Sequence, residues 1–324
     1  MSNRYSYSKL STLDQCGWRY YLTYILGHYT YSDSLETEWG TLVHHTEEMI
    51  GKAIKAGLPI PYDKLKDDFL HINIPKKNKY DTEGGIFGVD TLKKKYPLEF
   101  VTTNENGQTY TTKTEYYLNH GIYRLERYMK DNPDLEIYDL EKPFSYSFDT
   151  NILGGFIDRI FHNKATGEYI IEDIKTKDKL FKDDQLVTPL QFVVYALALQ
   201  DTLGEDVKLS CAYDLPFCDC RQAAGSERFI KRGVDKIKSL FGKEASGDFA
   251  PNPSPLCAWC SFSPTSNKQP EEAKGLCPYH SLWTRAHKTF AVAHKWEGMD
   301  KHEQVMKRIR VDQLNEELGI DFDF

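Results

Sequence analysis

Near the start of the chain, apolar residues recur with the period of a helix. Between residues 35 and 56 they recur about every 3.6 positions, which predicts an amphipathic helix with its apolar stripe on a core. The stripe consists of Trp39, Leu42, Val43, Met49, Ile50 and Ile54. Ahead of it, residues 1–34 indicate a short helix that is rich in tyrosine and contains Cys16.

From residue 140 onward the pattern changes to that of strands. Residues 140–148, 152–161 and 167–175 predict three strands, the last two joined by the turn-like segment HNKATG. An apolar helix over residues 190–203 and a further strand over residues 207–213 follow. A helix, three strands, a helix and a strand in this order indicate an α/β fold.

These elements divide the chain into four parts. Residues 1–56 form the N-terminal helices, and residues 57–139 read as an insertion, mainly helical, with one helix over residues 113–129. Residues 140–214 form the core sheet and helix. Residues 215–324 form a cysteine-rich region that ends in helices.

The composition is that of a globular protein, with 40% hydrophobic and 27% charged residues. No apolar run approaches the ~20 residues that cross a bilayer, and the first residues lack the layout of a signal peptide. We therefore expect a cytoplasmic protein that does not enter a membrane. Its net charge of −7 argues against a general nucleic-acid coat protein but leaves room for an enzyme with a local basic cleft. Lysines do cluster, at residues 76–79, 93–95 and 175–182, although solvated surface explains such runs equally well.

Chemistry is concentrated in the third predicted strand. Because side chains alternate along a strand, Asp173 and Lys175 project to one face while Glu172 projects to the other. A carboxylate can hold a divalent cation and an ammonium can stabilise developing negative charge, so the pair can act on one phosphate. Asp158 in the preceding strand offers a second oxygen ligand. Taken alone, Asp173 and Lys175 could also be a surface ion pair.

Two helices add further candidates. His44 lies on the polar face of the first helix, one turn after Gly40, where a neutral imidazole could bind a metal. Gln191 and Tyr195 are four residues apart and so share a face of the later helix. A solvated helix face and plain helix packing, respectively, would also account for them.

In order along the chain, four motifs resemble the RecB-like branch of the PD-(D/E)XK nucleases, which includes the CRISPR-adaptation nucleases and the AddB nuclease. The motifs are Gly40-Thr-Leu-Val-His44, Gly155-Phe-Ile-Asp158, Asp173-Ile-Lys175 and Gln191-Phe-Val-Val-Tyr195. The resemblance implies a restriction-endonuclease-like core, a central mixed sheet flanked by helices, with a largely helical insertion and a cysteine-clamped C-terminal region.

The resemblance also implies roles for these residues. His44, Asp158, Asp173 and the carbonyl of Ile174 would bind Mg²⁺ or Mn²⁺. Lys175 would position the attacking water and stabilise the transition state. Gln191 and Tyr195 would orient the strand that carries the scissile phosphate.

Four of the seven cysteines can form a separate metal site. Cys257 and Cys260 form a C-x-x-C motif, Cys277 follows, and Cys16 lies near the other end. Four thiolates suit a [4Fe–4S] cluster or a structural Zn²⁺, and the resemblance favours the cluster. The other donors available are Cys211, Cys218 and Cys220, which also read as a buried strand thiol and two loop thiols.

The sequence thus predicts a metal-dependent DNA nuclease, an exonuclease or end-processing enzyme acting on single-stranded DNA or DNA ends in repair or recombination. The alternatives are a structure-specific endonuclease and a non-catalytic DNA-binding subunit. No G-x-x-x-x-G-K-[ST] phosphate loop is present, so a separate helicase or recombination protein would supply any unwinding. Bases could stack on the tyrosines that follow Cys16, or these rings could pack the helices. They are Tyr20, Tyr21, Tyr24, Tyr29 and Tyr31.

Overall fold

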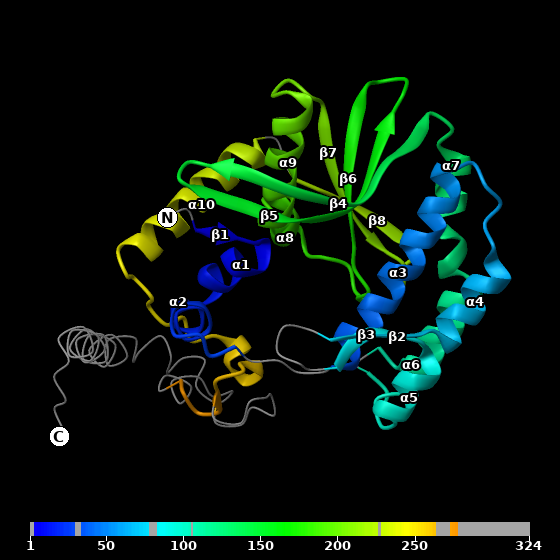
Figure 1. The fold of residues 1–324 in the computed structure, drawn as a ribbon, viewed down its shortest axis with the longest axis horizontal. Coiled ribbons are helices and arrows are strands. Elements are labelled where there is room, and N and C mark those ends of the chain that lie inside the picture. Colours follow the sequence, from blue (N-terminus) through cyan, green and yellow to red (C-terminus); the bar gives the residue numbers. More distant parts are fainter. Residues whose placement is uncertain are drawn as a thin grey trace. The chain divides into compact units, whose positions relative to one another are not determined.

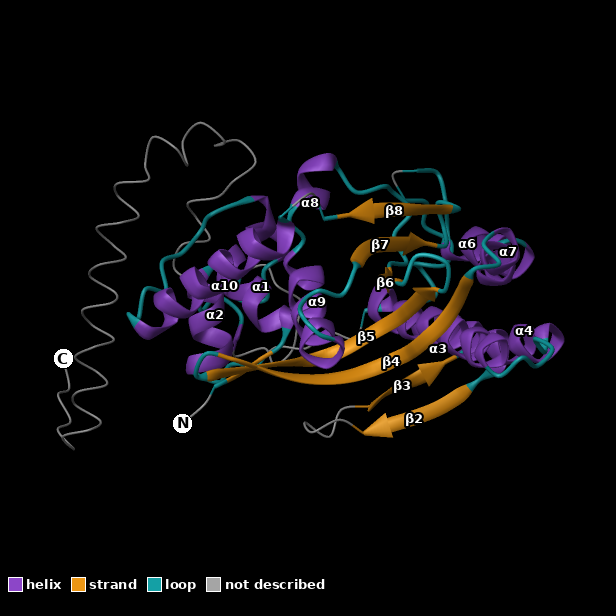
Figure 2. Ribbon diagram, turned by 90° about the horizontal axis from the view of Figure 1, so that it is seen from above, coloured by secondary structure: helices purple, strands orange, loops and turns teal. Residues whose placement is uncertain are grey.

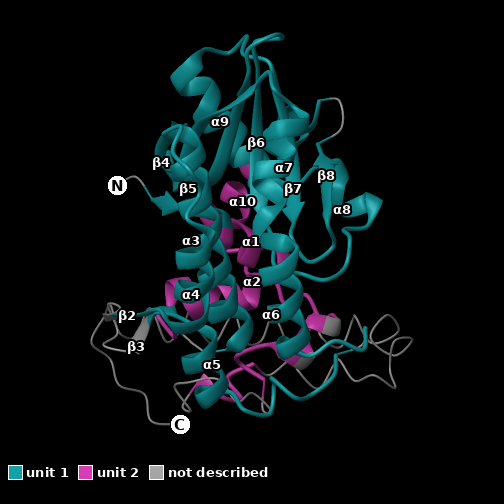
Figure 3. Cartoon of the chain, turned by 90° about the vertical axis from the view of Figure 1, so that its right-hand side faces the viewer, with its two compact units in different colours: residues 1–7, 33–236 teal, residues 8–32, 237–324 magenta. Residues whose placement is uncertain are grey.

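A computed structural model describes residues 3–29, 34–77, 83–104, 106–225, 228–263 and 273–277 (Figure 1). The chain divides into two compact units (Figure 3). Residues 1–7 and 33–236 form unit 1, and residues 8–32 and 237–324 form unit 2. The helices expected at the end of the chain lie outside the described residues.

A mixed sheet of six strands forms the centre of unit 1. The strands are β1 (Arg4–Tyr5), β4 (Leu135–Phe148), β5 (Asn151–Asn163), β6 (Glu168–Ile174), β7 (Leu209–Leu215) and β8 (Cys220–Ala224). They follow the order β1-β5-β6-β7-β8, with β4 on the other edge of β5. The pairs β6–β7 and β1–β5 are parallel and the rest are antiparallel. The strands predicted from alternation are confirmed.

The pairing leaves an opening along one edge of β5. On this edge β1 pairs with Ile152 and Leu153, and β6 pairs from Arg159 onward. Among the described residues, no strand pairs with residues 154–158 on that edge. Asp158 is the last residue of this opening, so its side chain lies where two strands diverge.

Helices cover both faces of the sheet. The helix α3 (Leu35–Lys55) begins at Ser34, whose side chain accepts a hydrogen bond from the Thr37 backbone N–H. It matches the predicted helix, although Met49 is 39% exposed and does not belong to the buried stripe. The helix α9 (Leu190–Leu203) lies on the opposite side of the sheet from α3 (Figure 1). The α/β architecture is therefore a central mixed sheet flanked by helices.

The stretch Asp183–Leu203 is long and apolar enough to cross a membrane, judged by length and composition alone. It contains α8 (Asp183–Val187) and α9. Nine consecutive residues of α9, Gln191–Leu199, are buried within the fold. Because it packs on β4 and β6, α9 has the character of the core helix of a globular domain.

The segment between α3 and β4 is only partly helical. It contains α4 (Tyr62–His71), β2 (Asn73–Lys77), β3 (Glu83–Phe87), α5 (Val89–Lys95), α6 (Tyr110–Asn119), η2 (Gly121–Tyr123) and α7 (Arg124–Asp131). The antiparallel hairpin of β2 and β3, whose arrows lie side by side in Figure 2, was not expected from the sequence. The single helix predicted over residues 113–129 is wrong: the chain turns at His120, and Gly121 packs so closely on the Tyr117 ring that a Cβ atom would lie 2.5 Å from it.

In unit 2 the predicted N-terminal helix is broken at Cys16. The residue is extended (φ −163°, ψ 112°) between α1 (Tyr7–Gln15) and α2 (Gly17–Tyr20). Gly17 follows the break, and its lack of a side chain lets the Phe249 backbone approach closely, since a Cβ atom there would lie 2.7 Å from it. The π-helical turn η1 (Tyr21–Ile25), the second half of α10 (Phe229–Ala245) and the 3₁₀ turn η3 (Pro255–Trp259) complete the described part of this unit.

Candidate active site

Asp158 is fixed where β5 and β6 diverge. Arg159 pairs with Glu172 in the antiparallel ladder, so Asp158 lies opposite Asp173. The backbone N–H of Ile174 donates a hydrogen bond of 2.8 Å to Asp158 Oδ2. The carboxylate is thereby held against the end of the strand that carries Asp173.

Asp173 is 1% exposed, and both of its carboxylate oxygens are engaged. Lys175 Nζ lies 2.5 Å from Oδ2, and Gln191 Nε2 donates a 2.7 Å hydrogen bond to Oδ1. The same amide nitrogen lies 2.8 Å from the hydroxyl oxygen of Tyr195, one turn further along α9. The four polar side chains of the D-x-K and Q-x-x-x-Y motifs therefore form one connected group.

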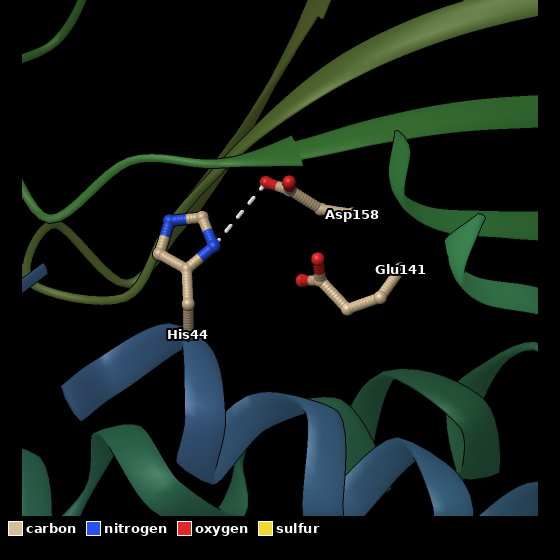
Figure 4. Close-up of side chains that lie close together, drawn as sticks. All are labelled: His44, Glu141 and Asp158. Carbon is tan, nitrogen blue, oxygen red and sulfur yellow. Dashed lines mark ion pairs between the residues drawn. The ribbon is translucent and has the colours of Figure 1, made fainter. Parts of the chain in front are cut away.

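His44 approaches Asp158 from α3. Its Nδ1 lies 3.5 Å from Asp158 Oδ2, and the imidazole forms a hydrogen bond with the backbone of Ile174. Figure 4 shows that Glu141, from β4, points at the same place. Among the described residues, His44, Glu141 and Asp158 alone bring three histidine, cysteine or carboxylate ligand atoms within 4.8 Å of one another.

Glu141 was not predicted from the sequence. It lies between Leu140 and Lys142, which pair with Arg159 and Ile157, so it stands opposite Asp158. Its φ of 44° is in the left-handed region, which costs a residue with a side chain about 1–2 kcal/mol. Backbone strain of this kind clusters at functional sites, which makes Glu141 a candidate member of this one.

The electrostatics of the group favour a cation. Burial raises the pKa of Asp173 to about 7, although Lys175 opposes the shift. Burial and the neighbouring Asp158 charge raise the pKa of Glu141 to about 7, and burial also raises the pKa of Asp158. Burial lowers the pKa of His44, which keeps the imidazole neutral and able to bind a metal.

These groups fit a divalent cation. Three carboxylates face one ammonium. Burial lowers the pKa of Lys175, but the negative groups around it, with Asp173 first and Asp158 next, together raise its pKa above the ordinary value, so the ammonium stays charged. When the carboxylates are ionised, the group has two negative charges in excess. Oxygen ligands with one imidazole suit Mg²⁺ or Mn²⁺.

Glu172 takes no part in this group, as alternation predicted. Its side chain is 1% exposed and lies 2.9 Å from Arg159 Nη1 and 2.6 Å from Arg221 Nε. Of the predicted metal ligands, the structure brings His44 and Asp158 close together. Glu141 stands beside these two residues, and Asp173 lies alongside, bound to Lys175.

In unit 2, the four predicted cysteines Cys16, Cys257, Cys260 and Cys277 line one cavity. The Asn252 backbone N–H lies 3.5 Å from Cys16 Sγ, and the Ser254 backbone N–H lies 3.4 Å from Cys257 Sγ. Burial raises the pKa of Cys257, and the Ser254 contact opposes that rise.

The three other cysteines belong to unit 1. Cys211 is buried in β7, and burial raises the pKa of its thiol. Cys218 Sγ lies 3.8 Å from the Lys177 carbonyl oxygen. Cys218 lies in the turn that joins β7 to β8, and Cys220 is the first residue of β8.

A match to a known family covers most of the chain. The model of the PD-(D/E)XK nuclease superfamily matches residues 4–265. Among solved structures, the chain is similar to a crystal structure from Eubacterium rectale described as a "putative exonuclease", with 12% identity and a TM-score of 0.41 over 79% of this chain and 86% of that one. No curated protein matches the chain. Because the family model covers more than half of the chain and every residue of the candidate active site, the protein belongs to the PD-(D/E)XK nuclease superfamily.

Proposed function

We propose that this protein is a Mg²⁺- or Mn²⁺-dependent deoxyribonuclease that hydrolyses phosphodiester bonds at DNA ends or in single-stranded DNA. The observation that carries the proposal is the meeting of Asp158, Asp173 and Lys175 where β5 and β6 diverge, with His44 beside them. Membership of the nuclease superfamily supports the reaction class. The substrate and the metal are our inference.

The cation would be held by His44, Asp158 and Glu141, with Asp173 and the Ile174 carbonyl as further ligands. When bound, a divalent metal polarises the phosphate and lowers the pKa of water. Lys175, which is held by Asp173, would place its ammonium beside the attacking water and the phosphate oxygens, where it offsets the negative charge that develops.

Gln191 and Tyr195 act on Asp173 in this scheme. Both are less than 10% exposed, which leaves little of either side chain for a nucleic acid to touch. Gln191 donates to Asp173 Oδ1, so the Asp173 carboxylate is oriented before substrate arrives. We therefore propose that Gln191 and Tyr195 orient the Asp173 carboxylate and do not contact the DNA strand directly.

For the cysteine cavity we propose a [4Fe–4S] cluster, with a structural Zn²⁺ as the alternative. The cavity brings all four predicted cysteines together, which suits either group by count. The family resemblance favours the cluster. Its role here would be to hold residue 16 to the segment around residue 257.

Fewer of the tyrosines after Cys16 are available to stack on the bases of single-stranded DNA than the sequence suggested. Tyr20 and Tyr21 are buried and pack on Phe249 with ring centroids 5.9 and 5.2 Å apart. Tyr24 and Tyr29 keep partly exposed rings, and Tyr31 lies outside the described residues. Packing thus accounts for two of the five rings, and up to two described rings could stack on bases.

Lysines after the active-site strand offer a second contact to nucleic acid. Lys179 and Lys182 are exposed, and Lys177 lies over the Phe181 ring, with its Nζ 3.6 Å from the centroid. Because the net charge is −7, phosphate attraction must be local, and binding should weaken steeply with salt. We also propose that the protein is cytoplasmic and that a separate helicase or recombination protein supplies any unwinding.

The experiment is a cleavage assay with three DNA substrates: a linear single strand, a linear duplex and a closed circle. The linear substrates are labelled at either end, and RNA versions of them test the preference for DNA. We expect metal-dependent cleavage of linear single strands and ends. Cleavage of closed circles would favour the structure-specific endonuclease. Binding of DNA without cleavage in Mg²⁺ or Mn²⁺ would favour a non-catalytic subunit.

A further inference from the structure

An ionic cluster fills the space between α3 and the sheet, on the opposite side of the strands from Asp173. Its centre is Arg159, which is 0% exposed. Arg159 Nη2 lies 3.2 Å from Glu47 Oε2, and Nη1 lies 2.9 Å from Glu172 Oε2. One guanidinium thus contacts a carboxylate from α3 and a carboxylate from β6, while its own backbone belongs to β5.

Each of these three residues is close in sequence to a candidate metal ligand. Glu47 follows His44 by three residues on α3, and Arg159 directly follows Asp158. Glu172 directly precedes Asp173. Because adjacent residues of a strand point to opposite faces, a contact that fixes Arg159 against Glu172 also fixes Asp158 against Asp173 on the other face.

The rest of the cluster balances the charge. Arg124 Nη2 lies 2.9 Å from Asp214 Oδ1, and Arg221 Nε lies 2.6 Å from Glu172 Oε1. Together with Arg159, these arginines face the three buried carboxylates of Glu47, Glu172 and Asp214. Tyr117 donates a 2.8 Å hydrogen bond to Glu47. The three arginines balance the charge of the three carboxylates. Because the carboxylates and Arg159 are at most 1% exposed, a displacement would leave a buried charge without its partner.

We propose that Arg159 is a positioning residue that sets the distances between His44, Asp158 and Asp173 and thereby the affinity for the divalent cation. This inference rests on the proposed function in one respect, namely that His44, Asp158 and Asp173 are taken as the metal ligands. The planar guanidinium suits the task because it presents several N–H groups in a rigid fork and can hold two carboxylates at once. A lysine has the same charge, but it concentrates that charge on one nitrogen at the end of a flexible side chain and lacks the rigid fork.

The test is direct binding of Mn²⁺ to the metal-free full-length protein, measured by calorimetric titration without nucleic acid. The variant is Arg159→Lys, and the matched control is Arg124→Lys. Arg124 is a buried arginine of the same cluster, but it contacts Asp214 and Asp219 and neither Glu47 nor Glu172. Thermal unfolding of each variant shows how much stability either change costs.

We expect Arg159→Lys to weaken Mn²⁺ binding by about 10- to 100-fold, the range seen when residues that orient metal ligands are replaced. Arg124→Lys should bind Mn²⁺ within about twofold of the wild type at a comparable loss of melting temperature. In cleavage assays, Arg159→Lys should need correspondingly more Mn²⁺ and recover most of its rate at saturation. Equal Mn²⁺ affinity in Arg159→Lys and the wild type would overturn the inference.

If Arg159→Lys does not fold, Glu47→Gln provides the same test. It keeps the shape of the side chain and removes the ionic contact between α3 and β5, so Mn²⁺ binding should again weaken about tenfold or more. Unchanged affinity would overturn the inference. A wild-type protein that binds Mn²⁺ but cleaves no nucleic acid would refute the proposed function and leave the positioning role of Arg159 standing.

Discussion

Replacing Glu141 by glycine separates the cost of its backbone from the value of its carboxylate. The residue has a φ of 44° within a strand, and its side chain points at His44 and Asp158. Alanine at this position would remove the carboxylate and keep the strained backbone. Glycine would remove both, so the two variants lack the carboxylate alike and differ in their backbone energetics.

The magnitude follows from two opposing terms. The left-handed conformation costs a residue with a side chain about 1–2 kcal/mol. Glycine avoids that cost but loses roughly 0.5–1 kcal/mol more conformational entropy on folding. The difference lies between 0 and about 1.5 kcal/mol, so at its midpoint Glu141→Gly should be about 0.75 kcal/mol more stable than Glu141→Ala, with a melting temperature about 1.5–3 °C higher.

Both variants should bind Mn²⁺ more weakly than the wild type. A cation site loses affinity as carboxylate ligands are removed, and we expect a loss of about tenfold, or roughly 1.4 kcal/mol. The expected pattern is a glycine variant that is more stable than the alanine variant without metal and equally impaired in binding it.

The assay is thermal unfolding in EDTA combined with Mn²⁺ titration. Asp149→Gly is a matched control, because Asp149 also has a positive φ (52°) but lies exposed between β4 and β5. It should gain stability without any change in Mn²⁺ affinity. A Glu141→Gly protein that binds Mn²⁺ as the wild type does would refute the assignment of Glu141 to the metal site.

Two further predictions concern pH and the cysteines. The pKa values of Asp173 and Glu141 are raised to about 7, so the stability that their neutral forms contribute is fully present below their ordinary pKa values and is lost as the pH rises through 7. The melting temperature of the metal-free protein should therefore fall between pH 5 and pH 8, because both carboxylates ionise while buried. With Mn²⁺ bound, the melting temperature should fall much less over this range. A metal-free melting temperature that rises over this range would contradict the assignment. Anaerobically purified protein should be brown, and Cys16→Ser or Cys260→Ser should bleach and destabilise it while Cys218→Ser should not. A colourless protein with one zinc per chain would decide for the structural zinc site.

Strand alternation and helix periodicity predicted much of the site. The D-x-K spacing places Asp173 and Lys175 on one face and Glu172 on the other, and the ion pairs of these residues agree with that. The stripe of α3 leaves His44 off the core face, where it meets Asp158. These positions follow from local geometry, which the sequence encodes directly.

Glu141 could not be predicted in this way. It stands in an ordinary run of charged and apolar residues, and no local period distinguishes it. Its place in the site depends on a backbone φ of 44° and on pairing with β5, both of which are set by the tertiary structure. Its position directly before Lys142 and Pro143, where regular strand pairing is unfavourable, is the only sequence signal that it offered.

The cysteine site and the β2–β3 hairpin show the same limit. Spacing alone could not choose among seven cysteines, because Cys16 meets Cys257 only through a contact between distant parts of the chain. The choice came from family resemblance. In the hairpin, a lysine-rich strand faces one with two glycines, and neither has the alternation that marks a strand.

The most direct test of the central claim is single-turnover cleavage of end-labelled single-stranded DNA in Mn²⁺ by the wild type, Asp173→Ala and Lys175→Ala. Glu205→Gln, an exposed carboxylate beyond the end of α9, serves as the control, and thermal unfolding verifies that each variant is folded. We predict that both site variants lose at least ~100-fold in rate, the scale on which a group that stabilises transition-state charge contributes, and that EDTA abolishes cleavage by the wild type. A folded Asp173→Ala protein that cleaves at the wild-type rate would contradict the account.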